Sequence, residues 1–204
     1  MQETNYPSKL LNNAVAEFAK LPGIGSKTAL SLVLHLLKKT EEDVMLSGET
    51  MIELKKNIKK CKVCKNVSDH DICEICNNDE RNNEQICIVE NINDVIAIEK
   101  TRQYNGLYHV LGGLISPMDG IGPDNLEIET LIERIGKQQT EEIIFALNTT
   151  PEGDTTNYYL HKKISNFNIK ITALSRGVSI GSELQYTDEI TLGRSIVNRI
   201  LFEN

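Results

Sequence analysis

Four cysteines are the residues of this chain whose spacing has the clearest chemical meaning. They form two C-x2-C pairs separated by eight residues: Cys61, Cys64, Cys73 and Cys76. Each C-x2-C turn brings two thiolates to one metal ion, and four thiolates complete the tetrahedron of a closed, structural zinc site. The alternative is a pair of redox motifs, which would follow a strand and open a helix. These cysteines lie instead in the polar stretch CKVCKNVSDHDICEIC. We therefore expect structural Zn²⁺ to supply the folding free energy of this segment.

A glycine-rich hairpin near the N-terminus is the second pattern. Apolar residues recur at helical spacing from Ser8 to Ala19, Leu21-Pro22-Gly23-Ile24-Gly25 breaks that helix, and Ser26 is expected to cap a second one. Two glycines let the backbone approach a phosphate, helix N–H groups point outward, and Lys27 adds positive charge. The pattern predicts contact with a DNA backbone regardless of sequence. The alternative is a purely structural turn between two helices.

Acidic residues follow several segments that are expected to be strands. Four short apolar runs alternate with helical stretches, as in a parallel α/β sheet: Ile86–Val89, Leu107–Val110, Glu142–Leu147 and Lys170–Ala173. Sites in such sheets lie beyond the carboxyl ends of the strands, where Glu90, Asp119 and the segment 148–154 are expected. Carboxylates at that edge suit a divalent metal ion. The alternative is that they are solvated loop acids.

The remaining elements must carry these residues. We expect helices over Asp94–Lys100, Asn125–Ile135 and Thr155–Ile164 between the strands, and a third N-terminal helix from Glu41 to Lys60 that leads into the cysteine loop. The last expected helix, Thr187–Phe202, has an apolar stripe that is either core or an oligomer contact. Cys87 stands apart from the other cysteines in an apolar strand, where a small buried hydrophobe is the better interpretation.

Composition and charge narrow the class of protein. With 204 residues, 40% of them hydrophobic, the chain is long enough for one or two domains, and its composition excludes a disordered or collagen-like protein. No apolar run is long enough to span a membrane, and the N-terminal residues lack the pattern of a signal peptide. We therefore expect a cytoplasmic protein. The net charge of −7 is uneven: residues 1–76 carry 11 basic and 10 acidic residues, and residues 77–204 carry 11 and 19. DNA affinity is therefore expected in the N-terminal third, where six lysines fall between Lys55 and Lys65.

Several longer strings occur together in one order. They are LPGIGSKTA, the four-cysteine loop, ICIVENINDVIAIEKT, YHVLGGLISPMDGIGPDNL, ALNTTPEGDTT and ALSRGVSIGSELQYTDEITL. On these strings, from about Leu10 to the C-terminus, the chain closely resembles the RecR family of bacterial recombination mediators. The resemblance implies an α+β multidomain fold. Its parts are a helix-hairpin-helix DNA-binding domain (1–56), a four-cysteine zinc finger (57–80), an α/β Toprim domain with a parallel sheet (81–174) and a C-terminal helical tail for subunit assembly (175–204).

The resemblance also implies an activity, which is mediation rather than bond chemistry, so no enzyme is expected. Members of the family assemble into a homotetrameric ring that can act as a clamp on single- or double-stranded DNA. They work with RecO, and in many bacteria also with RecF, to help RecA displace single-strand-binding protein and load at gaps and breaks. The expected location is the nucleoid in the cytoplasm, with no membrane partner.

The family's motif assigns the DNA-facing positions of the hairpin to Lys20, Gly23, Gly25 and Lys27. Ser31 stands where many relatives have an arginine, which removes one phosphate contact, and the lysines at 55–65 are hypothesised to compensate. Charge reversal in that lysine cluster should then weaken DNA binding.

Catalytic Toprim proteins hold Mg²⁺ with a glutamate and an Asp-x-Asp pair. Glu90 keeps the first position here, but neutral residues begin at Asn148 where the aspartate pair would stand, so no nuclease or topoisomerase activity is predicted. The remaining acids are expected to bind Mg²⁺ weakly or to form an acidic patch for RecO: Glu90, Asp94, Glu152 and Asp154. Two other functions stay open at this point. One is a Mg²⁺-dependent, nuclease- or topoisomerase-like Toprim enzyme, and the other is a zinc-dependent scaffold that binds only proteins.

Overall fold

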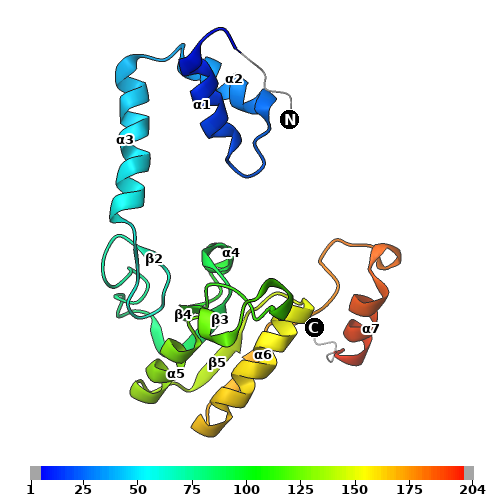
Figure 1. Ribbon diagram of the computed structural model, residues 1–204. Coiled ribbons are helices and arrows are strands. Elements are labelled where there is room, and N and C mark those ends of the chain that lie inside the picture. Colours follow the sequence, from blue (N-terminus) through cyan, green and yellow to red (C-terminus); the bar gives the residue numbers. More distant parts are fainter. Residues whose placement is uncertain (1–5, 200–204) are drawn as a thin grey trace. The chain divides into compact units, whose positions relative to one another are not determined.

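The first of two units is helical. The computed structural model describes residues 6–199, and the chain divides between Ile58 and Lys59. The first unit contains α1 (Lys9–Ala19), α2 (Ser26–Leu36) and α3 (Glu41–Asn57) (Figure 1). Apolar residues on facing sides of α1 and α2 make its small core, in which Val15, Ala29 and Val33 are buried. This pair of helices and the break between them are as the sequence predicts.

The third helix differs from its prediction in extent and in burial. It ends at Asn57 rather than Lys60, because Ile58 is extended and the two lysines that follow pair with another strand. None of its seventeen described residues is buried. Its apolar side chains are therefore exposed, among them Met45, Leu46, Met51, Ile52 and Leu54.

The second unit begins with the cysteine loop and continues into a parallel sheet. β1 (Lys59–Lys60) and β2 (Val67–Ser68) form an antiparallel ribbon. The sheet has the strand order β4-β3-β5-β6, and all of its pairs are parallel. The elements of this part, in chain order, are β3 (Asn82–Val89), α4 (Ile92–Thr101), β4 (Gly106–Val110), η1 (Pro117–Asp119), η2 (Pro123–Asn125), α5 (Ile128–Lys137), β5 (Glu142–Phe145), α6 (Pro151–Ile164), η3 (Ser165–Phe167), β6 (Lys170–Ala173), η4 (Leu184–Tyr186) and α7 (Glu189–Val197).

Alternation along the strands separates two cores, one on each face of the sheet. Ile86 and Ile88 pack with residues of α5 and α6, and Cys87 and Val89 pack on the opposite face with Val95 of α4 (Figure 1). The mixed α/β fold and its parallel sheet are therefore as predicted, and Cys87 is a buried core residue. No helix within residues 6–199 is long and apolar enough to cross a membrane.

The boundaries of several other elements also differ from prediction. β3 begins at Asn82, four residues before the expected Ile86, and α7 begins at Glu189. The end predicted for this last helix, Phe202, lies outside the described residues. α6 begins at Pro151 rather than Thr155, because the Thr150 side chain caps it by accepting a hydrogen bond from the Gly153 amide.

Candidate functional site

The four predicted cysteines converge on one point. The Sγ atoms of Cys61, Cys64, Cys73 and Cys76 all lie within 4.8 Å of one another, and the Cys64 and Cys73 sulfurs are 3.5 Å apart. Three of the four side chains are buried. Zinc at about 2.3 Å from each of four sulfurs sets neighbouring sulfurs about 3.8 Å apart. The arrangement therefore fits a tetrahedral zinc ion without rearrangement of the chain.

Local backbone bonds build this centre. The Lys65 amide donates to the Cys61 carbonyl at 3.0 Å, with Lys65 in the left-handed region at φ 64°, so the turn closes tightly behind the first cysteine pair. The Cys73 amide donates to the Cys61 sulfur at 3.3 Å, which links the second pair to the first. Such bonds to sulfur orient the ligands that a metal ion needs.

The titration of the cysteines reflects their closeness. A hydrogen bond between Cys64 and Cys73 raises the pKa of Cys64 and lowers the pKa of Cys73. Burial and the neighbouring Cys76 also raise the pKa of Cys64. Thiols this close cannot all ionise unless a cation neutralises them, so the donor set favours a divalent ion that binds thiolate, such as zinc.

The hairpin between α1 and α2 has an open glycine turn. Gly23 adopts φ +77°, a conformation that favours glycine, and the Ile24 amide donates to the Leu21 carbonyl at 3.1 Å. Gly25 has an ordinary φ of −81°, and a Cβ atom built there would meet nothing within 4 Å. Packing among the described residues therefore does not require a glycine at this position, and the space beside its backbone is open.

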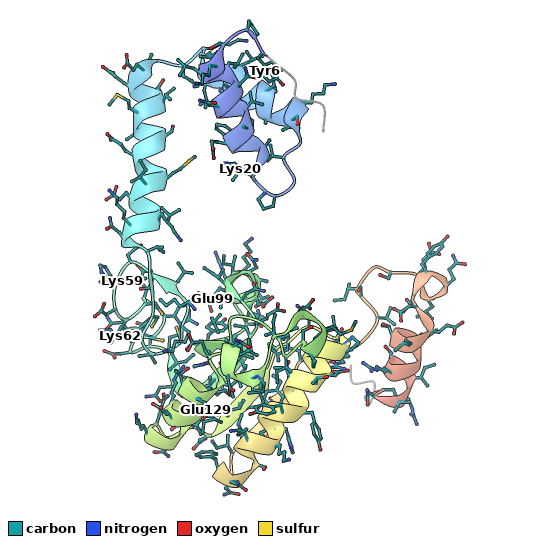
Figure 2. The ribbon with its side chains drawn as sticks, in the orientation of Figure 1. Tyr6, Lys20, Lys59, Lys62, Glu99 and Glu129 are labelled. Carbon is teal, nitrogen blue, oxygen red and sulfur yellow. The ribbon has the colours of Figure 1, made fainter. Side chains whose placement is uncertain are left out.

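The predicted cap of α2 is wrong by one residue. Ser26 is the first helical residue, and Gly25 is the N-cap, with no side-chain hydrogen bond at that end of the helix. The first N–H groups of α2 are thus free of a side-chain cap, which leaves them available to an anion. Lys27, in the first turn, is exposed and makes no ion pair with any residue in 6–199. Lys20, labelled in Figure 2, is exposed and pairs with Glu17 at 2.7 Å.

The lysine cluster between Lys55 and Lys65 is partly neutralised. Lys59 and Lys62, labelled in Figure 2, both pair with Asp71, at 3.1 and 2.6 Å. Lys60 and Lys65 each lie 3.7 Å from a carboxylate oxygen of Glu127. These carboxylates lie outside the run of lysines, so the sequence of the cluster alone did not reveal them. Four of its six lysines therefore have an acidic partner, which weakens the idea that the cluster compensates for Ser31.

The predicted Toprim acids do not gather as the cysteines do. Glu90, at the end of β3, accepts a hydrogen bond from the Asn148 side chain at 2.8 Å. Asp94 caps its own helix, because its carboxylate accepts from the Asn91 amide at 3.0 Å. Among the residues that the structure describes, the cysteine tetrad is the one group of three or more ligand-type side chains close enough to share a metal ion.

Glu152 and Asp154 lie in the first turn of α6 rather than in a loop. Acids are favoured at a helix N-terminus by the helix dipole, which gives both a structural role. Asp154 also pairs with Arg176 at 2.7 Å and lies 4.0 Å from Arg194. The hydrogen bond from Arg176 is the main cause that lowers the pKa of Asp154. Sequence reasoning missed Arg176. The signal that could have indicated it is that it is the single cation in the Ser- and Gly-rich segment after β6.

A helix-hairpin-helix, a four-cysteine centre and a Toprim fold in one chain define a class of DNA-recombination and repair proteins. Family models match the chain in four places: the RecR helix-hairpin-helix at residues 11–46, the RecR four-cysteine zinc finger domain at 58–78, the Toprim domain at 84–175 and the RecR C-terminal region at 177–200. The four-cysteine centre is accordingly a structural zinc site.

Curated relatives match along nearly the whole chain. The chain is 58% identical over 197 residues to recombination protein RecR of Bacteroides fragilis and 56% identical over 197 residues to that of Bacteroides thetaiotaomicron. Each alignment covers 97% of this chain and 96% of the relative. Recombination protein RecR of Flavobacterium johnsoniae is 52% identical over 198 residues, with the same coverage. The chain belongs to the RecR family of recombination proteins.

Proposed function

We propose that this protein is a recombination mediator that binds DNA as a clamp and performs no bond chemistry. It acts with RecO, and with RecF where that protein is present, to help RecA load onto DNA coated by single-strand-binding protein at gaps and breaks. The observation that carries the proposal is the hairpin. An open Gly25, a helix N-terminus without a side-chain cap, and Lys27, which has no ion pair within residues 6–199, together form a site for a phosphate. Backbone N–H groups and one lysine do not read bases, so binding is independent of sequence.

A non-catalytic role fits the state of the Toprim acids. Glu90 is bonded to Asn148, Asp94 is used within its helix, and Asp154 is paired with arginine. Two-metal phosphoryl chemistry needs carboxylates that converge on the ions. A Mg²⁺-dependent nuclease- or topoisomerase-like activity would require these contacts to break first. The excess of acidic over basic residues in 77–204, 19 against 11, instead favours a basic partner protein, and we assign that partner as RecO.

Assembly into a homotetrameric ring fits the exposed apolar side chains at both ends of the chain. α3 exposes Met45, Met51 and Leu54 in the first unit, and the tail exposes Tyr186 and Ile190 in the second. Several exposed apolar side chains on one helix, as on α3, are consistent with a protein–protein contact. A ring whose hairpins face the lumen also explains how a chain with a charge of −7 can encircle DNA.

Charge reversal in the hairpin tests the DNA-binding part of the proposal. Lys27→Glu in the full chain should weaken binding to duplex DNA about tenfold or more, equally for unrelated sequences. It should also reduce the slope of log affinity against log salt concentration by about one for each phosphate that the protein no longer neutralises. Lys39→Glu is the matched control, because Lys39 is an exposed lysine beyond the C-terminal end of α2, a helix about 16 Å long. Unchanged affinity in Lys27→Glu would make the hairpin a structural turn and favour a scaffold that binds only proteins.

A further inference from the structure

Arg134 of α5 is a buried cation that has no carboxylate partner among the described residues. The residue is only 8% exposed. One Nη1 hydrogen bond goes to the Tyr108 carbonyl at 2.7 Å and one Nε bond to the Gln138 side chain at 3.2 Å, while Nη2 is buried without a partner. No ion pair within residues 6–199 includes Arg134. A buried guanidinium without a counter-charge is strongly unfavourable, so a negative group is expected nearby.

The position of Arg134 on the sheet points to the cysteine centre. β4 is an edge strand of the parallel sheet, and its free edge is covered in two places. The Val110 amide donates to the Cys64 carbonyl at 2.8 Å, and two residues earlier the Tyr108 carbonyl accepts from Arg134. Groups two residues apart on a strand face the same side. The guanidinium and the first cysteine turn therefore occupy adjacent positions along one strand edge.

The charged groups around Arg134 support the same centre. Burial lowers the pKa of Arg134, and the charges of Cys76, Cys64 and Cys61 act against that shift by favouring the guanidinium form. His109 is also close, but burial lowers the pKa of its imidazole to about 4, so it is neutral at pH 7. Glu127, another acid of this region, already lies beside Lys60 and Lys65. When they bind zinc the cysteines are thiolates, and they are thus the negative groups that remain for Arg134.

We propose that Arg134 is the counter-cation of the zinc centre and couples the metal to the Toprim sheet. Four thiolates and one Zn²⁺ leave two negative charges on a largely buried site, and a cation held beside it offsets part of that charge. Arg134 acts through charge rather than through a hydrogen bond to sulfur, since its Nη2 has no such partner. It is a positioning residue of the zinc centre, held by the edge strand that the cysteine turn also covers.

The proposal makes opposite predictions for the zinc-loaded and the zinc-free protein. In full-length Arg134→Gln, zinc release to a chelator should be about ten- to a hundredfold faster than in the unsubstituted protein. The unfolding temperature of the zinc-loaded form should fall, whereas that of the zinc-free form below neutral pH, with its thiols protonated, should stay the same or rise. The zinc-free result follows because the substitution removes a buried charge that then has no partner. A purely structural role of Arg134 would lower both temperatures.

Lys137→Gln is the matched control, because Lys137 is an exposed cation on the same helix that pairs with Glu133 at 3.5 Å. Its zinc release should be unchanged. Arg134→Lys keeps the charge but loses the planar fork, so its release rate should lie between those of the unsubstituted and Gln proteins. If Arg134→Gln does not fold, Arg134→Met, which also removes the charge, takes its place. Zinc release equal to that of the unsubstituted protein in the neutral variant that folds would overturn the proposal, and so would lower unfolding temperatures in both metal states.

Discussion

The cysteine centre and the Toprim acids are two sets of ligand-type side chains in the same unit. They differ in the groups that they contact. The four sulfurs lie within 4.8 Å of one another and contact mainly each other. The acids are bonded to other groups: Glu90 to Asn148, and Asp154 to Arg176. Ligand chemistry alone therefore does not make a metal site. The side chains must also be free of partners within the chain.

Loss of a cysteine ligand should have the largest effect. Cys61→Ser should abolish stoichiometric zinc binding and lower the free energy of unfolding by about 4 kcal/mol or more, because the loop has no other core and covers the edge of β4. Zinc content and denaturant unfolding measure this. Cys87→Ala is the control, since Cys87 is a buried thiol of the sheet core and its loss should leave one zinc per chain. Full zinc content in Cys61→Ser would contradict the four-thiolate site.

The ion pair at Asp154 should have a small effect that depends on pH. Arg176 holds the pKa of Asp154 below its usual 3.8, so the folded state binds this proton less tightly than the unfolded state does. The stabilisation is present above that value and is lost as the pH falls below it. Both groups are partly exposed, so Arg176→Ala should cost under about 1 kcal/mol at neutral pH.

Denaturant unfolding across the acid range measures this difference between the unsubstituted and Arg176→Ala proteins. Arg194→Ala is the control and should have less effect, because Arg194 is 4.0 Å from the Asp154 carboxylate and the Arg176 contact is 2.7 Å. A difference that grows as the pH falls below the usual pKa of Asp154 would refute the assigned pair.

Magnesium should have the smallest effect. Because Glu90, Asp94 and Asp154 are already bonded within the chain, millimolar Mg²⁺ should neither raise the unfolding temperature nor produce nicking or relaxation of plasmid DNA. Calorimetry and plasmid gels measure the two responses. Cleavage that requires Mg²⁺ and disappears in Glu90→Gln would favour the enzymatic alternative and would remove the difference between the two regions.

The sequence predicted best those features that depend on residues close together in the chain. The cysteine tetrad and the hairpin were found because their spacing alone brings the groups together. The position of Glu90 followed from the parallel sheet, in which polar residues collect at the strand ends. The partners of the acids and lysines were not predicted. Arg176 reaches Asp154 from 22 residues away, and Glu127 lies far from Lys60 and Lys65 in the sequence.

The end of α3 shows a second reason why a prediction from the sequence was wrong. Helical propensity continues through Lys59 and Lys60, yet both residues pair with β2 in the ribbon that supports the cysteine turn. Tertiary contacts overrode local propensity there. The burial of Arg134 was also not predictable from the amphipathic pattern of its helix, because it depends on a contact with the Tyr108 carbonyl at the strand edge.

The central claim is tested most directly by measuring DNA binding of the zinc-loaded, full-length protein across a salt titration. The particle mass is measured by light scattering in the same buffers, and a parallel titration contains RecO. We expect particles with the mass of four 22.9 kDa chains that bind unrelated sequences equally. Their affinity should fall steeply and linearly with the logarithm of salt concentration, and RecO should strengthen binding. Absence of binding at every salt concentration, with and without RecO, would contradict the account and leave a zinc-stabilised protein scaffold in its place.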